Sequence, residues 1–359
     1  MGFFKSLIKK MLDEGHSVDI ATNETDSKVD PYYIKWGCQV YQMSWTRSPF
    51  KVGNLQAIKQ LKKILKEHHY DAVHCHTPIA AACTRLACRK FRKKGLKVFY
   101  TAHGFHFFHG APIKNWLVYY PIEKICAHWT DILITINQED YKRAKRKLHA
   151  RHVEYVPGVG IDIDKFSHSQ IDRDEKRAEL GIGKQDFLFL SVGELSIRKN
   201  HEAVIKALKE IDIAEWKYLI AGEGSLKTHL KNLAESLGVG DQVFLLGQRN
   251  DIAELCACSD LFVFPSLQEG LPVALMEAIA SKTPVLCSKI RGNVELVDES
   301  QTFSATSIAE ITNAIQSFLS QDDEKRKELI EKNYSNLSQY SIANVNDRML
   351  ELYSNVINI

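Results

Sequence analysis

The sequence predicts an α/β protein with two doubly wound parallel sheets. Strand-like apolar runs alternate with helix-like segments along the whole chain, which is typical of parallel α/β layers. The 359 residues exceed the size at which a single core stops growing, so two domains are expected. A content of 45% hydrophobic and 25% charged residues indicates a globular protein, and the sequence contains no apolar run long enough to span a bilayer.

The first half is expected to form one sheet whose central strand is missing. The predicted strands are 18–23, 39–43, 71–77, 97–103 and 131–136, and the predicted helices include 54–68, 79–94 and 137–148. A helix at 3–12 precedes them, where a doubly wound domain would begin with a strand. In the common order 3-2-1-4-5-6 that strand is central. Either the topology is unusual or the sequence starts late, and the late start is favoured.

The second half repeats the alternation. The predicted strands are 187–193, 216–222, 242–247, 261–266 and 284–289, and helices are expected to begin near Asn200, Ser225, Asp251 and Pro272. Residues 156–166 concentrate Pro, Gly and Asp, which favours a domain boundary there. We therefore expect a first domain at 1–160, a second at 161–340, and a C-terminal helix at 341–359 that returns towards the first.

Charge is distributed unevenly between the halves. Residues 1–150 hold 25 Lys and Arg against 12 Asp and Glu (+13), and the remainder holds 22 against 32 (−10). The basic residues lie beside apolar and aromatic ones, notably in 61–70, 88–97, 114–124 and 141–152. This pattern favours an anionic membrane surface as partner, although two independently solvated surfaces remain an alternative. Nucleic acid is not expected, because no binding motif accompanies the clusters.

Localisation is expected to be cytoplasmic, peripheral on the inner face of the cell membrane. The N-terminus alternates apolar and charged residues and lacks the continuous apolar region of a secretion signal. The eight cysteines include no Cys-x-x-Cys pair and are interpreted as reduced packing residues.

The stretch FPSLQEGLPVALMEA (264–278) predicts an anion site. It runs from a buried strand into a helix, and Pro272 suits the first helical turn. Gly270 and Leu271 would then present backbone N–H groups at a helix N-terminus. Glu269 would precede the helix and Glu277 would lie inside it, where each could bind a polar ligand. Alternatively, the first suits the helix dipole and the second is simply solvated.

This stretch, F-x-P-S-x-x-E-G-x-P followed by E-A, resembles the donor-site signature of family 4 retaining glycosyltransferases. The resemblance implies the GT-B fold, in which two Rossmann-like domains face each other across a cleft. It also implies that Glu269 contacts the transferred sugar, that Glu277 binds the ribose hydroxyls, and that Gly270, Leu271 and Pro272 face the diphosphate.

A second match is SVGELSIRKNHEAVIKAL (191–208), which resembles the family's strand, glycine turn and basic pair. It implies that Gly193 forms the turn and that Arg198 and Lys199 neutralise the diphosphate. Many members carry arginine where this chain has Glu194, so the number of phosphate-binding cations stays open. A solvated turn is the alternative for an isolated Arg-Lys pair.

Two further segments resemble the donor half of the family more weakly. LIAGEGSLK supplies Gly222 and Gly224 before a helix. LLGQRNDIAEL resembles the loop that holds the nucleobase, which makes Gln248 and Arg249 candidate neighbours of the ring, through side chain or main chain.

In the first half, TAHGFHF (101–107) is similar to the version in exopolysaccharide and capsule transferases. The resemblance places His103 beside the sugar donor. His76 and His106 are candidates for the acceptor side, and His74 is expected to be a satisfied structural histidine. The histidine spacing matches no zinc signature, so no metal is expected.

The resemblance as a whole implies a hexosyltransferase that needs no cofactor. It would move a sugar from a nucleotide diphosphate sugar to a lipid-linked or polysaccharide acceptor in bacterial surface polysaccharide assembly, with retention of the anomeric configuration. A UDP-sugar is the donor that the family leads us to expect. Two alternatives remain open. One is a sugar-nucleotide epimerase of the same architecture. The other, if the first strand is truly lost, is a noncatalytic nucleotide-sugar-binding protein.

Overall fold

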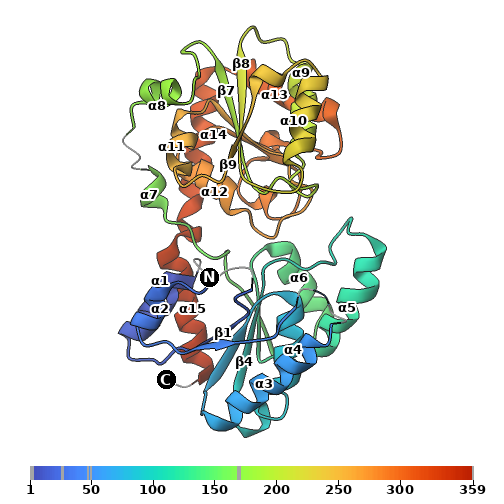
Figure 1. Ribbon diagram of the computed structural model, residues 1–359, viewed down its shortest axis with the longest axis vertical. Coiled ribbons are helices and arrows are strands. Elements are labelled where there is room, and N and C mark those ends of the chain that lie inside the picture. The colour runs from blue at the N-terminus through green and yellow to red at the C-terminus, as the bar shows by residue number, and fades with distance from the viewer. Residues whose placement is uncertain (1–3, 26–27, 47, 49–50, 168–170, 358–359) are drawn as a thin grey trace. The chain divides into compact units, whose positions relative to one another are not determined.

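A computed structural model describes residues 4–25, 28–46, 48, 51–167 and 171–357 (Figure 1). The chain forms two compact units. Unit 1 comprises Met1–Gly160 together with Ile342–Ile359, and unit 2 comprises Ile161–Ser341. No helix within the described residues has the length and hydropathy needed to cross a membrane.

The strands of unit 1 form two parallel sheets, β1-β2 and β3-β4-β5-β6. No strand among the described residues joins them, so the sheet is interrupted where the sequence placed the absent central strand. The elements of unit 1 are α1 (Lys5–Asp13), β1 (Ile20–Thr22), α2 (Pro31–Lys35), β2 (Val40–Gln42), α3 (Gly53–Glu67), β3 (Ala72–Cys75), α4 (Pro78–Cys88), β4 (Lys97–Ala102), α5 (Ile113–Ala127), β5 (Ile132–Thr135), α6 (Gln138–Lys147), β6 (His152–Tyr155) and α15 (Ile342–Ile357).

Helices cover both faces of the four-stranded sheet. Successive side chains of a strand point to opposite faces, and in this sheet both faces carry apolar side chains that pack against helices. Phe99 and Ile134 pack with Met349 in a cluster that includes residues of α1 and α15. Tyr100 follows Phe99 and Leu133 precedes Ile134, so both point to the other face, where they belong to a cluster with residues of α4, α5 and α6. Strands buried on both faces explain the nearly continuous apolar runs of the sequence.

Unit 2 contains one parallel sheet in the order β12-β11-β10-β7-β8-β9. Its elements are α7 (Ile163–Ser167), α8 (Arg173–Glu179), β7 (Phe187–Val192), α9 (His201–Lys209), β8 (Trp216–Ala221), α10 (Lys227–Ser236), β9 (Val243–Gly247), α11 (Ile252–Cys258), β10 (Leu261–Phe264), α12 (Val273–Ala280), β11 (Val285–Ser288), β12 (Thr302–Phe303), α13 (Ile308–Leu319) and α14 (Asp323–Asn336). Numbered within the unit, this is the doubly wound order 3-2-1-4-5-6, whose switch point lies between β7 and β10. Ligands of such sheets bind at the carboxyl ends of the strands at this point.

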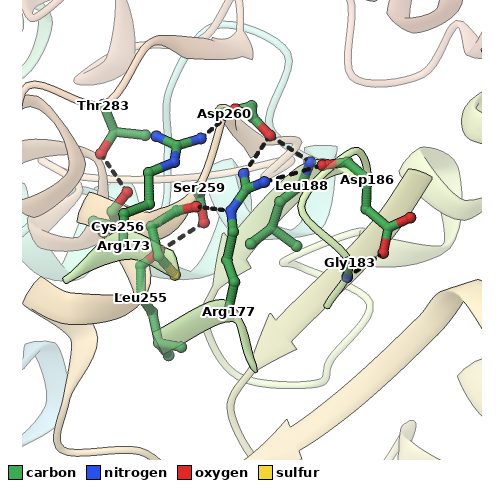
Figure 2. Close-up of polar contacts among 11 residues, drawn as sticks. Arg173, Arg177, Gly183, Asp186, Leu188, Leu255, Cys256, Ser259, Asp260 and Thr283 are labelled. Atoms are coloured by element: carbon green, nitrogen blue, oxygen red, sulfur yellow. Dashed lines mark hydrogen bonds and ion pairs between the residues drawn. The ribbon is translucent and has the colours of Figure 1, made fainter. Parts of the chain in front are cut away.

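A buried arginine fastens α8 to the sheet of unit 2 (Figure 2). Arg177 donates from Nε to the carbonyl of Cys258 at 2.9 Å and from Nη2 to Oδ2 of Asp260 at 2.6 Å. The same carboxylate oxygen accepts the amide of Leu188 at 2.7 Å, and the other oxygen binds Arg173. One carboxylate therefore ties α8 to the start of β7 beside β10.

Some elements differ from those predicted. The helix α5 and the strands β6 and β12 were not predicted, and the helix expected at 79–94 ends at Cys88, before a separate 3-10 turn at Arg92–Lys94. Pro121 lies inside α5, where proline usually interrupts a helix. Helix α12 begins at Val273, so Pro272 is its N-cap and does not lie in its first turn.

Candidate functional site

The loop after β7 is held by close contact with the glycines that follow β8. The Gly193 amide donates to Ala221 and the Leu195 amide to Glu223, both at 2.9 Å. A Cβ atom on Gly222 would lie 1.9 Å from the Gly193 carbonyl oxygen. A Cβ atom on Gly224 would also collide with backbone atoms, those of Leu195. Only glycine permits this approach. These glycines therefore set the course of the loop that carries the basic pair.

Asn200 directs the basic pair towards the end of β10. It is the N-cap of α9 and adopts a left-handed conformation (φ 57°). Its side-chain amide donates to the carbonyls of Pro265 at 3.2 Å and Ala305 at 2.8 Å. The Leu267 amide also donates to the carbonyl of Arg198 at 2.8 Å. The loops after β7 and β10 are thus joined at the switch point.

Both cations of the pair contact one carboxylate. Oε1 of Glu269 accepts from Nζ of Lys199 at 2.7 Å and from Nη1 of Arg198 at 3.0 Å. Lys199 is 9% exposed, and its Nζ lies 4.6 Å from the centre of the Phe264 ring. Burial lowers the pKa of Lys199, and the charge of Glu269 opposes that effect. The structure therefore brings together three of the predicted site residues.

The N-terminus of α12 presents unpaired amides beside this cluster. Neither the Gly270 nor the Leu271 amide has a hydrogen-bond acceptor among the described residues. Pro272, the N-cap, has no N–H and gives no side-chain cap. Arg291 donates from Nε to the carbonyl of Glu269 at 3.1 Å. The site thus combines cations with free amides, as an anionic ligand requires.

Glu277 lies half-buried in the second turn of α12. Burial raises the pKa of its carboxyl to about 7, and the charge of Lys165 on α7 acts in the opposite direction. Its carboxyl has no hydrogen-bond partner among the residues that the structure describes. It is available to accept hydrogen bonds from a ligand.

The guanidinium of Arg249 is already paired with a carboxylate. Its Nε donates to Oδ1 of Asp251 at 2.8 Å and its Nη2 contacts the other oxygen, with Glu179 3.9 Å away. The guanidinium therefore contacts carboxylates of its own region, and Gln248 beside it is exposed.

Three buried polar residues next to the predicted site were not singled out in the sequence. Ser196 Oγ, Ser266 Oγ and both ring nitrogens of His201 are buried without a hydrogen-bond partner. The His201 ring faces the backbone of Gly193 and Glu194 without reaching hydrogen-bond geometry, and burial lowers its pKa to about 4. The signal in the sequence was their position inside the two matched motifs, where Ser266 is the serine of F-x-P-S and the other two flank the basic pair. Such atoms normally bind ordered water or a ligand.

In unit 1, His103 follows β4 and contacts a second predicted residue. Its Nε2 lies 3.1 Å from Nδ1 of His76. The loop turns at Gly104 (φ 129°), and the Phe105 amide donates to Oδ2 of the buried Asp140 at 3.0 Å. This holds the loop that follows His103 against the start of α6.

His74 extends the histidine cluster. Its Nε2 lies 2.8 Å from Oγ1 of Thr101, its Nδ1 contacts the Tyr353 hydroxyl, and its ring centre lies 4.3 Å from that of His76. Burial lowers the pKa to about 3 for His74, to about 4 for His103, and well below the usual value for His76. All three are neutral near pH 7, so one ring of the His76–His103 pair donates and the other accepts.

His106 lies elsewhere in the same loop. Its ring stacks on Tyr119 of α5 with 4.4 Å between the ring centres. A small pocket of unit 1 is lined by His74, His76 and His103 together with residues of α1 and α15. Within the described part of the chain, no group of three or more His, Cys, Asp or Glu side chains is arranged to hold a metal ion.

Known proteins agree with the motifs in both units. The family profile described as "Glycosyl transferases group 1" matches residues 172–336, and "Glycosyltransferase Family 4" matches residues 3–165. A putative glycosyltransferase, EpsD of Bacillus subtilis, is 40% identical over 260 residues, which are 71% of this chain and 68% of that protein. The UDP-Gal:alpha-D-GlcNAc-diphosphoundecaprenol alpha-1,3-galactosyltransferase of Escherichia coli is 29% identical over 346 residues, 94% of this chain and 86% of that enzyme.

Among solved structures, Anabaena HepE in complex with UDP and glucose superposes with a TM-score of 0.75 at 20% identity, covering 90% of this chain and 88% of HepE. This likeness concerns the fold. The resemblance inferred from the donor-site motifs is confirmed by the family matches: the chain is a glycosyltransferase of the GT-B fold and belongs to glycosyltransferase family 4.

Proposed function

We propose that this glycosyltransferase moves a hexosyl group, with retention, from a UDP-sugar to a lipid-linked or polysaccharide acceptor in surface polysaccharide assembly. The observation that carries the proposal is the convergence of Arg198 and Lys199 on Glu269, beside the unpaired amides of Gly270 and Leu271. In the absence of donor, Glu269 neutralises two cations that are suited to a diphosphate.

The diphosphate would be held by charge and amides together. Lys199 and Arg198 would transfer part of their interaction from Glu269 to the phosphate oxygens, and the Gly270 and Leu271 amides would donate to the same groups. Glu269, partly released, would accept a hydroxyl of the sugar. Ser196, His201 and Ser266 have the polar atoms to order water around these groups.

The nucleoside would be held by two other features. Glu277 has a carboxylate without a hydrogen-bond partner, which suits the two ribose hydroxyls. Since the Arg249 guanidinium is paired with Asp251, we expect the loop at 247–249 to contact the base through its main chain.

The chemistry needs no enzymic nucleophile. The bond between the anomeric carbon and the β-phosphate oxygen breaks, and its electron pair stays on the phosphate. The acceptor oxygen attacks the same face of the sugar, and its proton passes to the departing phosphate oxygen. Lys199, Arg198 and the two amides stabilise the negative charge that develops on the leaving group. The proposal therefore assigns no role to a divalent ion.

In unit 1, we assign to His103 the task of binding a hydroxyl of the transferring sugar, with its ring held by His76. His106, stacked on Tyr119, is placed on the acceptor side. Support for a lipid-linked acceptor comes from the Escherichia coli relative, whose name specifies a diphosphoundecaprenol acceptor. With the basic first half of the chain, this favours peripheral association with the inner face of the cell membrane.

The test is a transfer assay with a panel of UDP-sugars and diphospholipid-linked sugar acceptors. NMR of the product should show the anomeric configuration of the donor, and chelators should leave the rate unchanged. Donor incubated without acceptor distinguishes the alternatives: epimerisation of the donor sugar would indicate an epimerase. UDP-sugar binding without turnover on any acceptor would indicate a binding protein.

A further inference from the structure

Helix α5 has apolar side chains on both of its sides. Its inner side packs on the sheet of unit 1, where Ala127 is buried and Trp116, Tyr119 and Tyr120 join the same cluster. Figure 1 shows α5 at the outer edge of this unit. A helix that is apolar all round is normally enclosed by protein or faces lipid. The outer side of α5 is enclosed by no described part of its own unit.

The outer side carries an aliphatic stripe. Ile113 is 77% exposed, Leu117 72%, Ile125 56% and Val118 37%. Pro121 is exposed on the same side. At about 100° per residue, these positions fall within an arc of about 120–140°. We call this set of five residues, together with Lys114 and Lys124, the outer face of α5.

The charges of the outer face have one sign. Lys114 and Lys124 are exposed within the same arc. The one carboxylate of the helix, Glu123, points inward, where its two oxygens bind Nη1 and Nη2 of Arg85 at 2.9 and 3.0 Å. Tyr100 also donates to Glu123, at 3.1 Å. The inner side is thus anchored by a buried ion pair, and the outer aliphatic residues are not needed to hold the helix.

We propose that the outer face of α5 is the surface by which this enzyme docks on an anionic membrane, with the helix lying along the lipid headgroups. This rests on the proposed function, because it names the surface behind the membrane association. Aliphatic residues flanked by lysines, without exposed carboxylates, match an anionic interface. At 15 residues the helix is about 22 Å long, too short to span a bilayer.

Docking through α5 also suits a lipid-linked acceptor. Ile113 follows His103 by ten positions, so the two lie within about 35 Å of each other whatever the path of the loop. His106, in that loop, stacks directly on Tyr119 of α5. An acceptor held at the membrane by its lipid would thus be presented near the loop that carries the candidate histidines.

The experiment is co-sedimentation of the full chain with vesicles of phosphatidylcholine alone or mixed with phosphatidylglycerol. Wild type should bind the mixed vesicles more strongly than the neutral ones. The double variant Ile113→Gln/Leu117→Gln should bind about tenfold less or weaker, because two exposed aliphatic side chains no longer enter the interface. Lys114→Glu/Lys124→Glu should lose the preference for anionic vesicles.

Matched controls come from the same unit. Ile34→Gln changes an exposed isoleucine of α2, and Lys59→Glu/Lys62→Glu reverses two exposed lysines of α3. Both should bind vesicles nearly as wild type does. All variants should unfold at the wild-type temperature, since none removes a buried side chain.

Three results would overturn the proposal. They are no binding of wild type to either vesicle, unchanged vesicle binding of the Ile113/Leu117 variant, or a loss of vesicle binding in the α2 and α3 controls as large as in the α5 variants. If the Ile113/Leu117 variant keeps vesicle binding but converts a dimer to a monomer in size-exclusion chromatography, the face is a contact between copies. A UDP thermal shift on the same samples separates this outcome from failure of the proposed function, because donor binding does not depend on α5.

Discussion

Nζ of Lys199 lies 2.7 Å from Oε1 of Glu269, and the two residues come from loops that follow different strands of the unit 2 sheet. Those strands, β7 and β10, meet at the switch point of the doubly wound order. The pair is buried, with Arg198 as a third, half-exposed member. Under the proposed function, a phosphate group of the donor would compete with Glu269 for both cations.

Substitutions of the two partners are therefore expected to differ in their effect on UDP affinity, although both should lower turnover. Lys199→Ala should lower turnover about 10²–10³-fold, the range for loss of one group that stabilises developing charge, and it should also weaken UDP binding. Glu269→Gln should lower turnover but leave UDP affinity unchanged or higher, because the cations lose a competing carboxylate. Steady-state kinetics and calorimetric UDP titrations measure both. Lys332→Ala, which changes an exposed lysine paired with Asp298, is the control. Weaker UDP binding by Glu269→Gln would contradict this assignment.

The raised pKa of the Glu277 carboxyl predicts that nucleotide affinity depends on pH. Burial raises its pKa to about 7 in the folded protein, so about half of the carboxyl groups are protonated at neutral pH. Ribose hydroxyls donate to the ionised form, which means that UDP affinity should fall as the pH drops below about 7, by up to about tenfold per unit. Calorimetry in buffers of different ionisation enthalpy should show proton release on binding.

Glu277→Gln is the control for this titration. It should bind UDP less tightly at pH 8 and, between about pH 5.5 and 8, should lose the share of the pH dependence that belongs to this carboxyl, so that only the titration of the terminal phosphate of UDP, at about pH 6, remains. A wild-type affinity that is constant over this range, or an equal slope in the variant, would mean that another group binds the ribose.

The sequence predicted the fold of unit 2 well and indicated the segments that carry the candidate site, because both depend on local patterns. Strands β7 and β10 are buried on both faces and read as unbroken apolar runs. The basic pair and the acidic loop follow these strands directly. In unit 1, α5 was not predicted because apolar residues on both sides leave no 3.6-residue period, and because it contains Pro121, a residue that usually interrupts a helix.

Side-chain pairings between distant segments could not be predicted in this way. Nothing local indicates that His76 contacts His103, that Lys199 is paired with Glu269, or that His201 is buried without a partner. Each depends on which strands become neighbours and on how deeply the side chain is buried. The helix N-terminus indicated Glu277 as a candidate, and the family resemblance proposed roles for His103 and Glu277. Their altered pKa values follow from burial that the sequence does not show.

Arg177 should be essential to the stability of unit 2. Arg177→Met removes the donor to Asp260 and to two backbone carbonyls, and it should reduce the free energy of unfolding by about 3 kcal/mol. Arg173→Met alters the same carboxylate from a half-exposed position and should cost less than about 1 kcal/mol. Urea unfolding measures both, and equal losses in the two variants would show that burial of Arg177 adds nothing.

His76 should act by positioning His103 and keeping it neutral. In the wild type, burial lowers the pKa of His103 to about 4, so its neutral ring serves at all higher pH values and kcat/KM should show no titration near pH 6.5. His76→Ala opens space beside the ring and removes its 3.1 Å contact. The pKa of His103 should then rise towards its usual value, and activity should fall as the pH drops through about 6. His76→Gln offers a replacement partner and should restore part of the wild-type profile, whereas His103→Asn should lower kcat at every pH with little change in UDP affinity. If His76→Ala lowers kcat/KM by one factor at all pH values, its role is packing and not control of the His103 proton.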